Sequence, residues 1–152
     1  IKIDNTKNWK KKHYKSILQA YNKSKFFHSF SDSLEDIYKK EWNSLFQLNL
    51  EIINFFKAYF NIKKKLYISS ELNLTGYGNE KLVNICKYFD AKYFVVKKNT
   101  EDYHPKEYFN NYGIDFKYHE NTHSEYKQMG NIFIPNLSIL DYAANNGNRL
   151  II

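Results

Sequence analysis

The sequence predicts an α/β fold in which a helical N-terminal part is followed by a small parallel or mixed sheet with a βαβ connection. Two observations support this fold class. Apolar residues recur at helical spacing through the first 62 residues. Beyond them, a strand-length apolar run, a helical segment and a second apolar run fit within about 30 residues, the spacing of a βαβ unit. We expect a single domain over residues 1–152, with a helical part at 1–62 and an α/β part at 63–152.

The helical part predicts three helices. From Thr6 onward, Trp9, His13, Ile17 and Tyr21 share one face, which places the His13 imidazole on the apolar side of the first helix. The sequence then predicts a short helix over Leu34–Lys40 and a long one over Trp42–Phe60. The long helix is apolar nearly all round, so we expect it to be continuous and largely buried.

The α/β part begins with a predicted strand at Leu66–Ser70 and a helix at about Glu80–Phe89. A second strand at Lys92–Val96 is apolar at consecutive positions, as buried parallel strands are. We therefore expect Leu66–Ser70 and Tyr93–Val96 to be parallel neighbours. The remaining predicted elements are a short helix within Tyr103–Tyr112, a strand at Ile114–Tyr118, a short strand at Ile132–Ile134 and a helix at Ser138–Asn145.

The composition excludes several classes of protein. The single cysteine, Cys86, excludes an intramolecular disulfide and a cysteine-based zinc cluster. No apolar run approaches the ~18–20 residues that span a bilayer, and the first 15 residues do not resemble a signal peptide. We therefore expect a cytoplasmic protein without a membrane span. Because Ile1 is not an initiator methionine, we interpret the chain as a fragment of a longer protein.

The net charge of +7 invites a nucleic-acid function, which we do not favour. Arg149 is the single arginine beside 22 lysines, and the lysines are scattered over the chain. Base readout and bidentate phosphate contacts favour arginine. A genome poor in G and C accounts for much of the lysine, so we expect no nucleic-acid partner.

Topology points to one candidate site. In open α/β sheets ligands bind beyond the carboxyl ends of parallel strands. This rule singles out Ser69, Ser70 and Glu71 after the first strand and residues 97–103 after the second. His104, His119 and His123 lie within 20 residues of one another, but without the acidic context of a zinc helix. We therefore predict no metal site, and the sequence indicates no particular cofactor.

Three stretches together resemble the WbqC-like family, bacterial proteins met in O-antigen and other surface-polysaccharide gene clusters. The stretches are Asn8–Ile17 with Ala20 and Tyr21, Ser69–Leu72 with Lys81–Lys87, and Tyr126–Gln128 with Phe133–Asp141. The chain departs from the family in two respects. An N-terminal segment of the His-Gln-Pro-x-Tyr type is missing, and Lys97-Lys98 stands where similar members carry Ser-Gly.

The resemblance implies an enzyme that modifies a sugar-nucleotide or lipid-linked sugar substrate, by transferring an acyl-type group to an amino sugar. Such a transfer needs a base and donors for the oxyanion. His13 or Glu71 is the candidate base, with Ser70, Tyr103 or backbone amides near Gly76 as donors. The expected substrate-binding residues are Trp9, Tyr103, Tyr126, Gln128, Ser138 and Asp141.

The sharpest site hypothesis places the His13 imidazole in one pocket with Ser70 and Glu71. The competing interpretation of His13 is a core histidine bonded to a backbone carbonyl. The alternative function is a non-catalytic sugar- or partner-binding module in a polysaccharide-biosynthesis assembly. An enzyme should gather several of the polar residues in one pocket, whereas a binding module should show an open aromatic platform.

Overall fold

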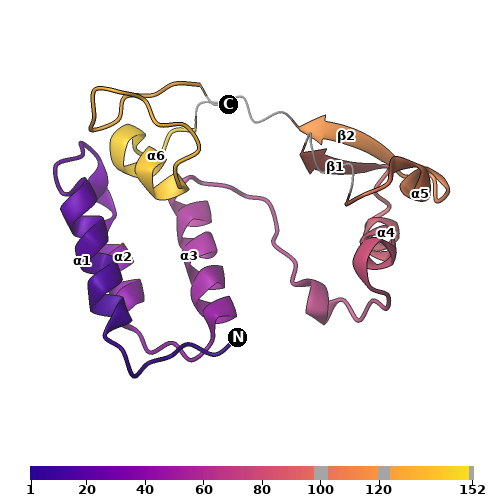
Figure 1. Cartoon of the computed structure of the whole chain (residues 1–152), viewed down its shortest axis with the longest axis horizontal. Coiled ribbons are helices and arrows are strands. Elements are labelled where there is room, and N and C mark those ends of the chain that lie inside the picture. Colours follow the sequence, from indigo (N-terminus) through magenta and orange to yellow (C-terminus); the bar gives the residue numbers. More distant parts are fainter. Residues whose placement is uncertain (98–102, 120–123, 151–152) are drawn as a thin grey trace. The chain divides into compact units, whose positions relative to one another are not determined.

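The structure is a computed structural model that describes residues 1–97, 103–119 and 124–150. It divides into two compact units (Figure 1). The described residues of the first, helical unit are 1–64 and 124–150, and those of the second unit are 65–97 and 103–119. The predicted fold class is confirmed: helices come first, and a small parallel sheet follows them. No helix within the described ranges is long and apolar enough to cross a membrane.

The helical unit contains four α-helices and a 3₁₀ turn among its described residues. They are α1 (Trp9–Tyr21), the turn η1 (Phe27–Ser29), α2 (Ser31–Lys39), α3 (Leu45–Tyr59) and α6 (Ile139–Asn146). α2 contacts both α1 and α3, and α6 contacts η1. The C-terminal segment 124–150, grouped with the α/β part on sequence grounds, thus lies in the helical unit.

Helix α1 begins three residues later than predicted. The Asp4 carboxylate accepts hydrogen bonds from the backbone N–H of Thr6, at 3.0 Å, and from its hydroxyl. These bonds hold residues 4–6 in a local turn, so the helix starts at Trp9.

The core of this unit is aromatic and close-packed. Phe27 is fully buried and packs edge-to-face on Phe30, with ring centroids 5.4 Å apart. Ala143 and Ala144 of α6 are also fully buried, and the Ala144 carbonyl accepts from the N–H of Phe26 at 2.9 Å. Gly147 ends α6 with a φ of +74°, and a Cβ there would lie 3.1 Å from the Phe26 ring. Small residues therefore allow the close approach of α6.

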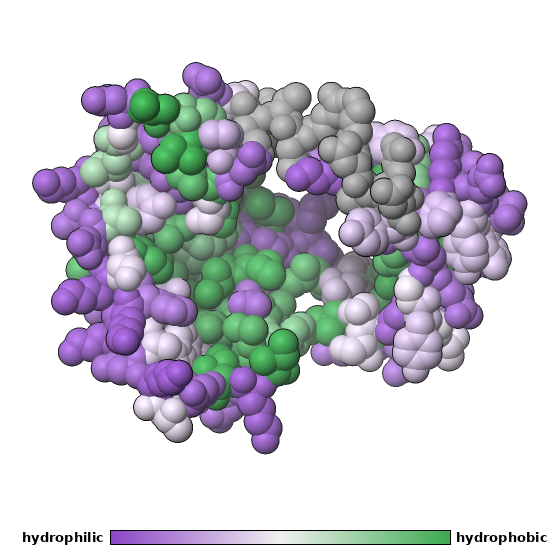
Figure 2. All heavy atoms as spheres, in the orientation of Figure 1, coloured by the Kyte–Doolittle hydropathy of each residue, from purple (hydrophilic) through white to green (hydrophobic). Residues whose placement is uncertain are grey.

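The prediction of one buried helix over Trp42–Phe60 was partly wrong. Ser44 is extended and forms an antiparallel bridge with Lys2, and the carbonyl of the preceding Asn43 accepts from the N–H of Ile3 at 3.1 Å. The helix therefore starts only at Leu45. Leu48 and Phe56 are buried, but Phe46 is 53% and Ile53 47% exposed. Figure 2 shows apolar side chains gathered over α3 on that face of the unit.

The second unit contains a parallel βαβ arrangement. Its elements are a 3₁₀ turn η2 (Ser69–Glu71), α4 (Gly78–Tyr88), β1 (Tyr93–Lys97), α5 (Lys106–Asn110) and β2 (Asp115–His119). The strands β1 and β2 pair in parallel, with Tyr93 opposite Asp115 and Lys97 opposite His119. Phe109 of α5 is fully buried and stacks on Phe94 of β1 at 5.0 Å.

The predicted pairing of Leu66–Ser70 with Tyr93–Val96 was wrong. Residues 66–68 form no strand, and the bond from the Glu71 N–H to the Ile68 carbonyl, at 2.9 Å, begins the turn η2 instead. The Tyr67 ring packs on Phe89, with centroids 4.7 Å apart, rather than in a sheet. The neighbour of β1 is β2, and within the described residues the sheet has two strands rather than the three expected.

The short strand expected at Ile132–Ile134 is also not formed. The Gln128 side-chain amide accepts from the N–H of Ile134 at 2.8 Å and donates to the Ile134 carbonyl at 2.9 Å. One side chain thus satisfies both backbone groups that a partner strand would have satisfied.

Candidate functional site

The predicted site residues are distributed over both units. Ser70, Glu71 and Tyr103 belong to the second unit, and the helical unit holds Trp9, His13, Tyr126, Gln128, Ser138 and Asp141. Each unit is described by itself. The meeting of His13 with Ser70 and Glu71 therefore stays a prediction.

Four of the expected substrate-binding residues lie together around α6. Asp141 is only 5% exposed and lies in the first turn of this helix, and Ser138 caps the helix by accepting from the Leu140 N–H at 3.2 Å. The Tyr126 hydroxyl donates to Asp141 Oδ2 at 2.7 Å, and Gln128 Nε2 donates to the same oxygen at 3.2 Å. The structure therefore brings Tyr126, Gln128, Ser138 and Asp141 into one network.

Two residues that the sequence interpretation missed complete this network. Asn145 Nδ2 donates to the backbone carbonyl of Asp141 at 2.9 Å and to its Oδ1 at 3.3 Å. Burial raises the pKa of Tyr21, and the negative charge and hydrogen bonding of Asp141 raise it further. Asn145 lies four residues after Asp141, so helical spacing could have indicated it. Tyr21 comes from α1, and no sequence signal links it to α6.

The network fixes the protonation of Tyr126. Burial, and then the hydrogen bond to the Asp141 carboxylate, raise the pKa of Tyr126 to about 12. At neutral pH the phenol therefore stays protonated and donates to Asp141. The positive end of the α6 dipole favours the buried negative charge of Asp141. Tyr126 can position a ligand, but it cannot serve as a base.

A small pocket of about 190 Å³ adjoins the network. Tyr126, Phe133 and Tyr142 supply aromatic walls, with the Tyr126 ring 5.2 Å from Phe133 and 5.1 Å from Tyr142. Ser138 and Asn136 add polar groups. Pockets for drug-sized ligands measure about 300–1,000 Å³, so this pocket has room for one ring of a larger ligand.

His13 does not point into the core, contrary to the prediction. It is exposed on α1, a helix without a single buried residue, and its ring packs edge-on against Trp9 at 5.5 Å and against Tyr38 of α2 at 6.4 Å. Within the described part of the chain the imidazole forms no hydrogen bond, so the interpretation as a bonded core histidine fails as well. The imidazole is open to solvent and to ligands.

Trp9, predicted to bind substrate, has a structural contact as well. Its indole N–H donates to Asn5 Oδ1 at 3.0 Å, and its ring lies 6.3 Å from that of Tyr38. The indole is half-buried between these neighbours.

In the second unit, the topological argument for a site no longer holds. Ser70 and Glu71 are exposed in η2 and do not follow a strand. The Tyr103 side chain is 76% exposed, and its backbone carbonyl accepts from Asn79 Nδ2 at 3.2 Å. Residues 98–102, also singled out from the sequence, lie outside the described residues.

The described residues contain no group of three histidine, cysteine or acidic side chains that could hold a metal ion. His104 Nδ1 instead pairs with Asn79 Oδ1 at 2.8 Å. His123, one of the three histidines weighed as metal ligands, lies outside the described residues.

The comparisons with known proteins decide the family. The model of the WbqC-like protein family matches residues 1–151. The chain belongs to this family. The chain is also 29% identical over 147 residues to an uncharacterized protein, Rv1507c, of Mycobacterium tuberculosis. The match covers 95% of the chain and 63% of the mycobacterial protein, so the chain spans less than two thirds of the length of that protein. No solved structure matches this WbqC-like chain.

The raised pKa of Tyr126 predicts a loss of stability in alkali. In the unfolded chain the phenol ionises near its ordinary value of 10.0, whereas in the folded protein it does so near 12. The stabilisation is therefore fully present below pH 10 and is lost as the pH rises from 10 toward 12. We expect the stability advantage of the wild type over Tyr126→Phe to shrink by about 1 kcal/mol between pH 8.5 and 11.5, a value reduced for partial solvent screening.

Urea unfolding of both proteins across this pH range measures the difference. Tyr77→Phe is the matched control for the loss of a phenol hydroxyl, because the Tyr77 side chain is 92% exposed. A gap that stays constant for Tyr126→Phe would contradict the assigned hydrogen bond.

Proposed function

We propose that this WbqC-like chain acts in the cytoplasm, in bacterial surface-polysaccharide biosynthesis, on an amino sugar to which it transfers an acyl-type group. The observation that supports this most is the pocket beside α6. Tyr126 and Ser138, both expected to bind substrate, line it, and the buried Asp141 lies behind Tyr126. Aromatic walls with a few convergent polar groups suit a sugar ring.

The transfer requires an activated acyl donor, a base, and hydrogen-bond donors for the oxyanion. The amine nitrogen of the sugar bonds to the carbonyl carbon of an activated acyl donor, and the leaving group departs with the bonding electron pair. A base takes the proton that the amine loses. Donors stabilise the oxyanion that forms meanwhile. In this proposal His13 or Glu71 is the base, and Ser70, Tyr103 or amides near Gly76 are the donors.

The exposure of His13 and Glu71 is compatible with these roles, because a base must reach the substrate. Tyr126 and Gln128 contribute differently: they hold Asp141 and the wall of the pocket in place. The alternative, a non-catalytic sugar-binding module, draws support from Tyr126 itself, which stays protonated and leaves the small pocket without a base.

The test combines the full chain with a nucleotide-linked amino sugar and a panel of acyl thioesters, and follows the amide product by mass spectrometry. We expect His13→Gln to keep the fold and to lower turnover by at least about 100-fold, the usual contribution of a general base. His28→Gln is the matched control, because His28 is also exposed but binds the Asn22 carbonyl, at 2.9 Å.

Two outcomes would contradict parts of this proposal. Full activity of His13→Gln would remove His13 from the mechanism. Saturable sugar binding that Tyr126→Phe weakens, without any product, would replace the transferase with the binding module.

A further inference from the structure

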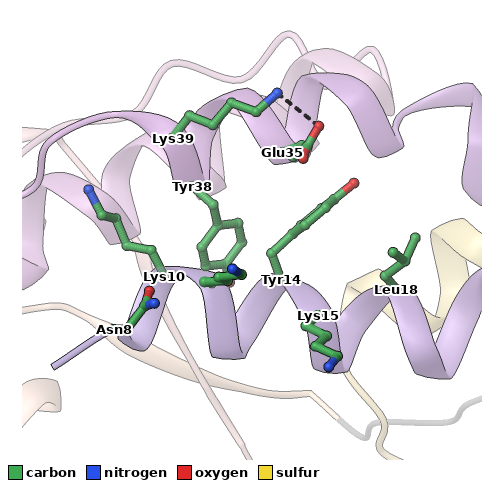
Figure 3. Close-up of a pocket in the computed structure, with 9 residues that line it drawn as sticks. Asn8, Lys10, Tyr14, Lys15, Leu18, Glu35, Tyr38 and Lys39 are labelled. Carbon is green, nitrogen blue, oxygen red and sulfur yellow. Dashed lines mark hydrogen bonds and ion pairs between the residues drawn. The ribbon is translucent and has the colours of Figure 1, made fainter.

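A second, larger depression lies between α1 and α2 in the helical unit. It has a volume of about 440 Å³, and the proposed function assigns nothing to it. Figure 3 shows side chains of both helices along it: Asn8, Lys10, Tyr14, Lys15 and Leu18 from the α1 side, and Glu35, Tyr38 and Lys39 from α2. Lys11 also lines it. We call this depression the α1–α2 groove.

The walls of the groove carry two anchored aromatic rings. Tyr14 and Tyr38 lie 6.0 Å apart at 43°. The Tyr14 hydroxyl donates to the backbone carbonyl of Ser31 at 3.2 Å, and Trp9 and His13 pack edge-on against Tyr38. Because these contacts fix both half-buried rings, the groove offers a preformed apolar surface for a planar ligand.

The groove also carries uncompensated positive charge. Its only acidic side chain, Glu35, is paired with Lys39 at 2.9 Å, and Lys10 is paired with Glu41 at 2.6 Å. Lys11 and Lys15 form no ion pair or hydrogen bond with any residue that the structure describes. They lie four residues apart on α1, so they extend from the same side of the helix.

Because the chain has many lysines, a single lysine is weak evidence for an anion-binding site. Here, however, two unpaired lysines flank two fixed tyrosines in one depression. Lysine binds phosphate as a point charge, and an aromatic ring stacks on any nucleobase. The spacing of Lys11, Tyr14, Lys15 and Leu18 along α1 is the sequence signal that could have indicated the groove.

We propose that the α1–α2 groove binds a nucleoside diphosphate, with the base against Tyr14 and Tyr38 and the phosphates at Lys11 and Lys15. The inference deepens the proposed function, because it makes the substrate a nucleotide-linked rather than a lipid-linked sugar. A lipid diphosphate would meet the same lysines but carries no aromatic base for the tyrosines.

The binding test needs no sugar and no acyl donor. The full chain is titrated with UDP, CDP, GDP and ADP, and with inorganic diphosphate, by calorimetry and by amide chemical shifts. At least one nucleoside diphosphate should bind saturably, at least 10-fold more tightly than inorganic diphosphate, with the largest shifts at α1 and α2. Equal affinity for inorganic diphosphate, or no saturable binding of any nucleotide, would overturn the proposal.

Variants assign the binding to the groove. Lys11→Gln and Lys15→Gln should each weaken nucleotide binding about 5-fold or more, and the affinity of both should depend less on salt. Lys12→Gln is the matched control on the same helix, because Lys12 is exposed and does not line the groove. An equal loss in Lys12→Gln would show non-specific charge attraction and overturn the site.

The tyrosines have their own pair of variants. Tyr14→Phe should retain nucleotide binding within about 3-fold, whereas Tyr14→Ala should lose about 10-fold or more of it and leave the affinity for inorganic diphosphate unchanged. Equal effects on both ligands would contradict stacking. Nucleotide binding in the groove without any acyl transfer would support the nucleotide site and contradict the proposed acyl-transfer function.

Discussion

Phe56→Ala is expected to lower the free energy of unfolding by about 3–5 kcal/mol, the usual loss for a core phenylalanine. Phe56 lies on the buried side of α3, in the core of the helical unit. Its ring lies 4.9 Å from Phe55, 6.2 Å from Phe30 and 6.3 Å from Phe60. Removing it opens a cavity that these fixed rings cannot fill. The midpoint of urea unfolding, followed by the fluorescence of Trp9 and Trp42 in the same unit, measures the loss.

Phe46→Ala is the matched control on the same helix. Its side chain is 53% exposed, so its loss should cost less than about 1 kcal/mol. Similar effects of both substitutions would show that the two positions have the same environment, contrary to the structure. A shift below about 1 kcal/mol for Phe56→Ala alone would place Phe56 outside the core.

The spacing of apolar residues predicted which segments form helices better than it predicted where each helix begins and ends. The sequence predicted helices at α1, α2, α3, α4 and α6, and all of these except α1 bury residues of the side that the sequence pattern marks. The ends depended on contacts distant in sequence. Trp42 lies outside α3 because its indole N–H donates to the Ile37 carbonyl at 2.8 Å while residues 43–44 pair with residues 1–3. No local pattern encodes such contacts.

The sheet shows the same limit. The apolar run at Leu66–Ile68 has strand composition, yet Tyr67 packs on Phe89 and no strand forms. Short apolar runs do not specify their partner, so the prediction placed the right second strand, β1, beside the wrong neighbour. The strand prediction at Ile114–Tyr118 agrees with β2, whose Phe116 is buried and whose alternating pattern was visible.

For the candidate site, the sequence predicted which residues lie together better than it predicted which way a side chain faces. Tyr126, Gln128, Ser138 and Asp141 were selected together, and they do meet around α6. The inward orientation of His13 was wrong, because the face that a helix buries depends on the helices packed against it. On the predicted apolar face of α1, Ile17 and Tyr21 pack against the core, whereas the exposed His13 contacts only the edges of the Trp9 and Tyr38 rings.

Asp141→Ala is the second substitution with a large expected effect, about 3–5 kcal/mol of unfolding free energy. The carboxylate is buried and accepts from Tyr126, Gln128 and Asn145. Without it these donors lose a charged acceptor, and each such bond contributes about 1.5–3 kcal/mol. The change also removes the negative charge from the first turn of α6. Urea unfolding measures the loss.

Asp32→Ala is the control for position, because Asp32 lies in the first turn of α2 but is exposed. Its loss should cost only about 0.3–1 kcal/mol, the contribution of a surface charge at a helix N-terminus. Asp141→Asn separates charge from shape. It keeps an oxygen for Tyr126 and Gln128, which share Oδ2, but turns its NH2 group toward the Asn145 amide, so its cost should fall between those of the two alanine variants. If Asp141→Ala and Asp32→Ala cost the same, Asp141 does not organise the wall of the α6 pocket, and the sugar site proposed there loses its structural basis.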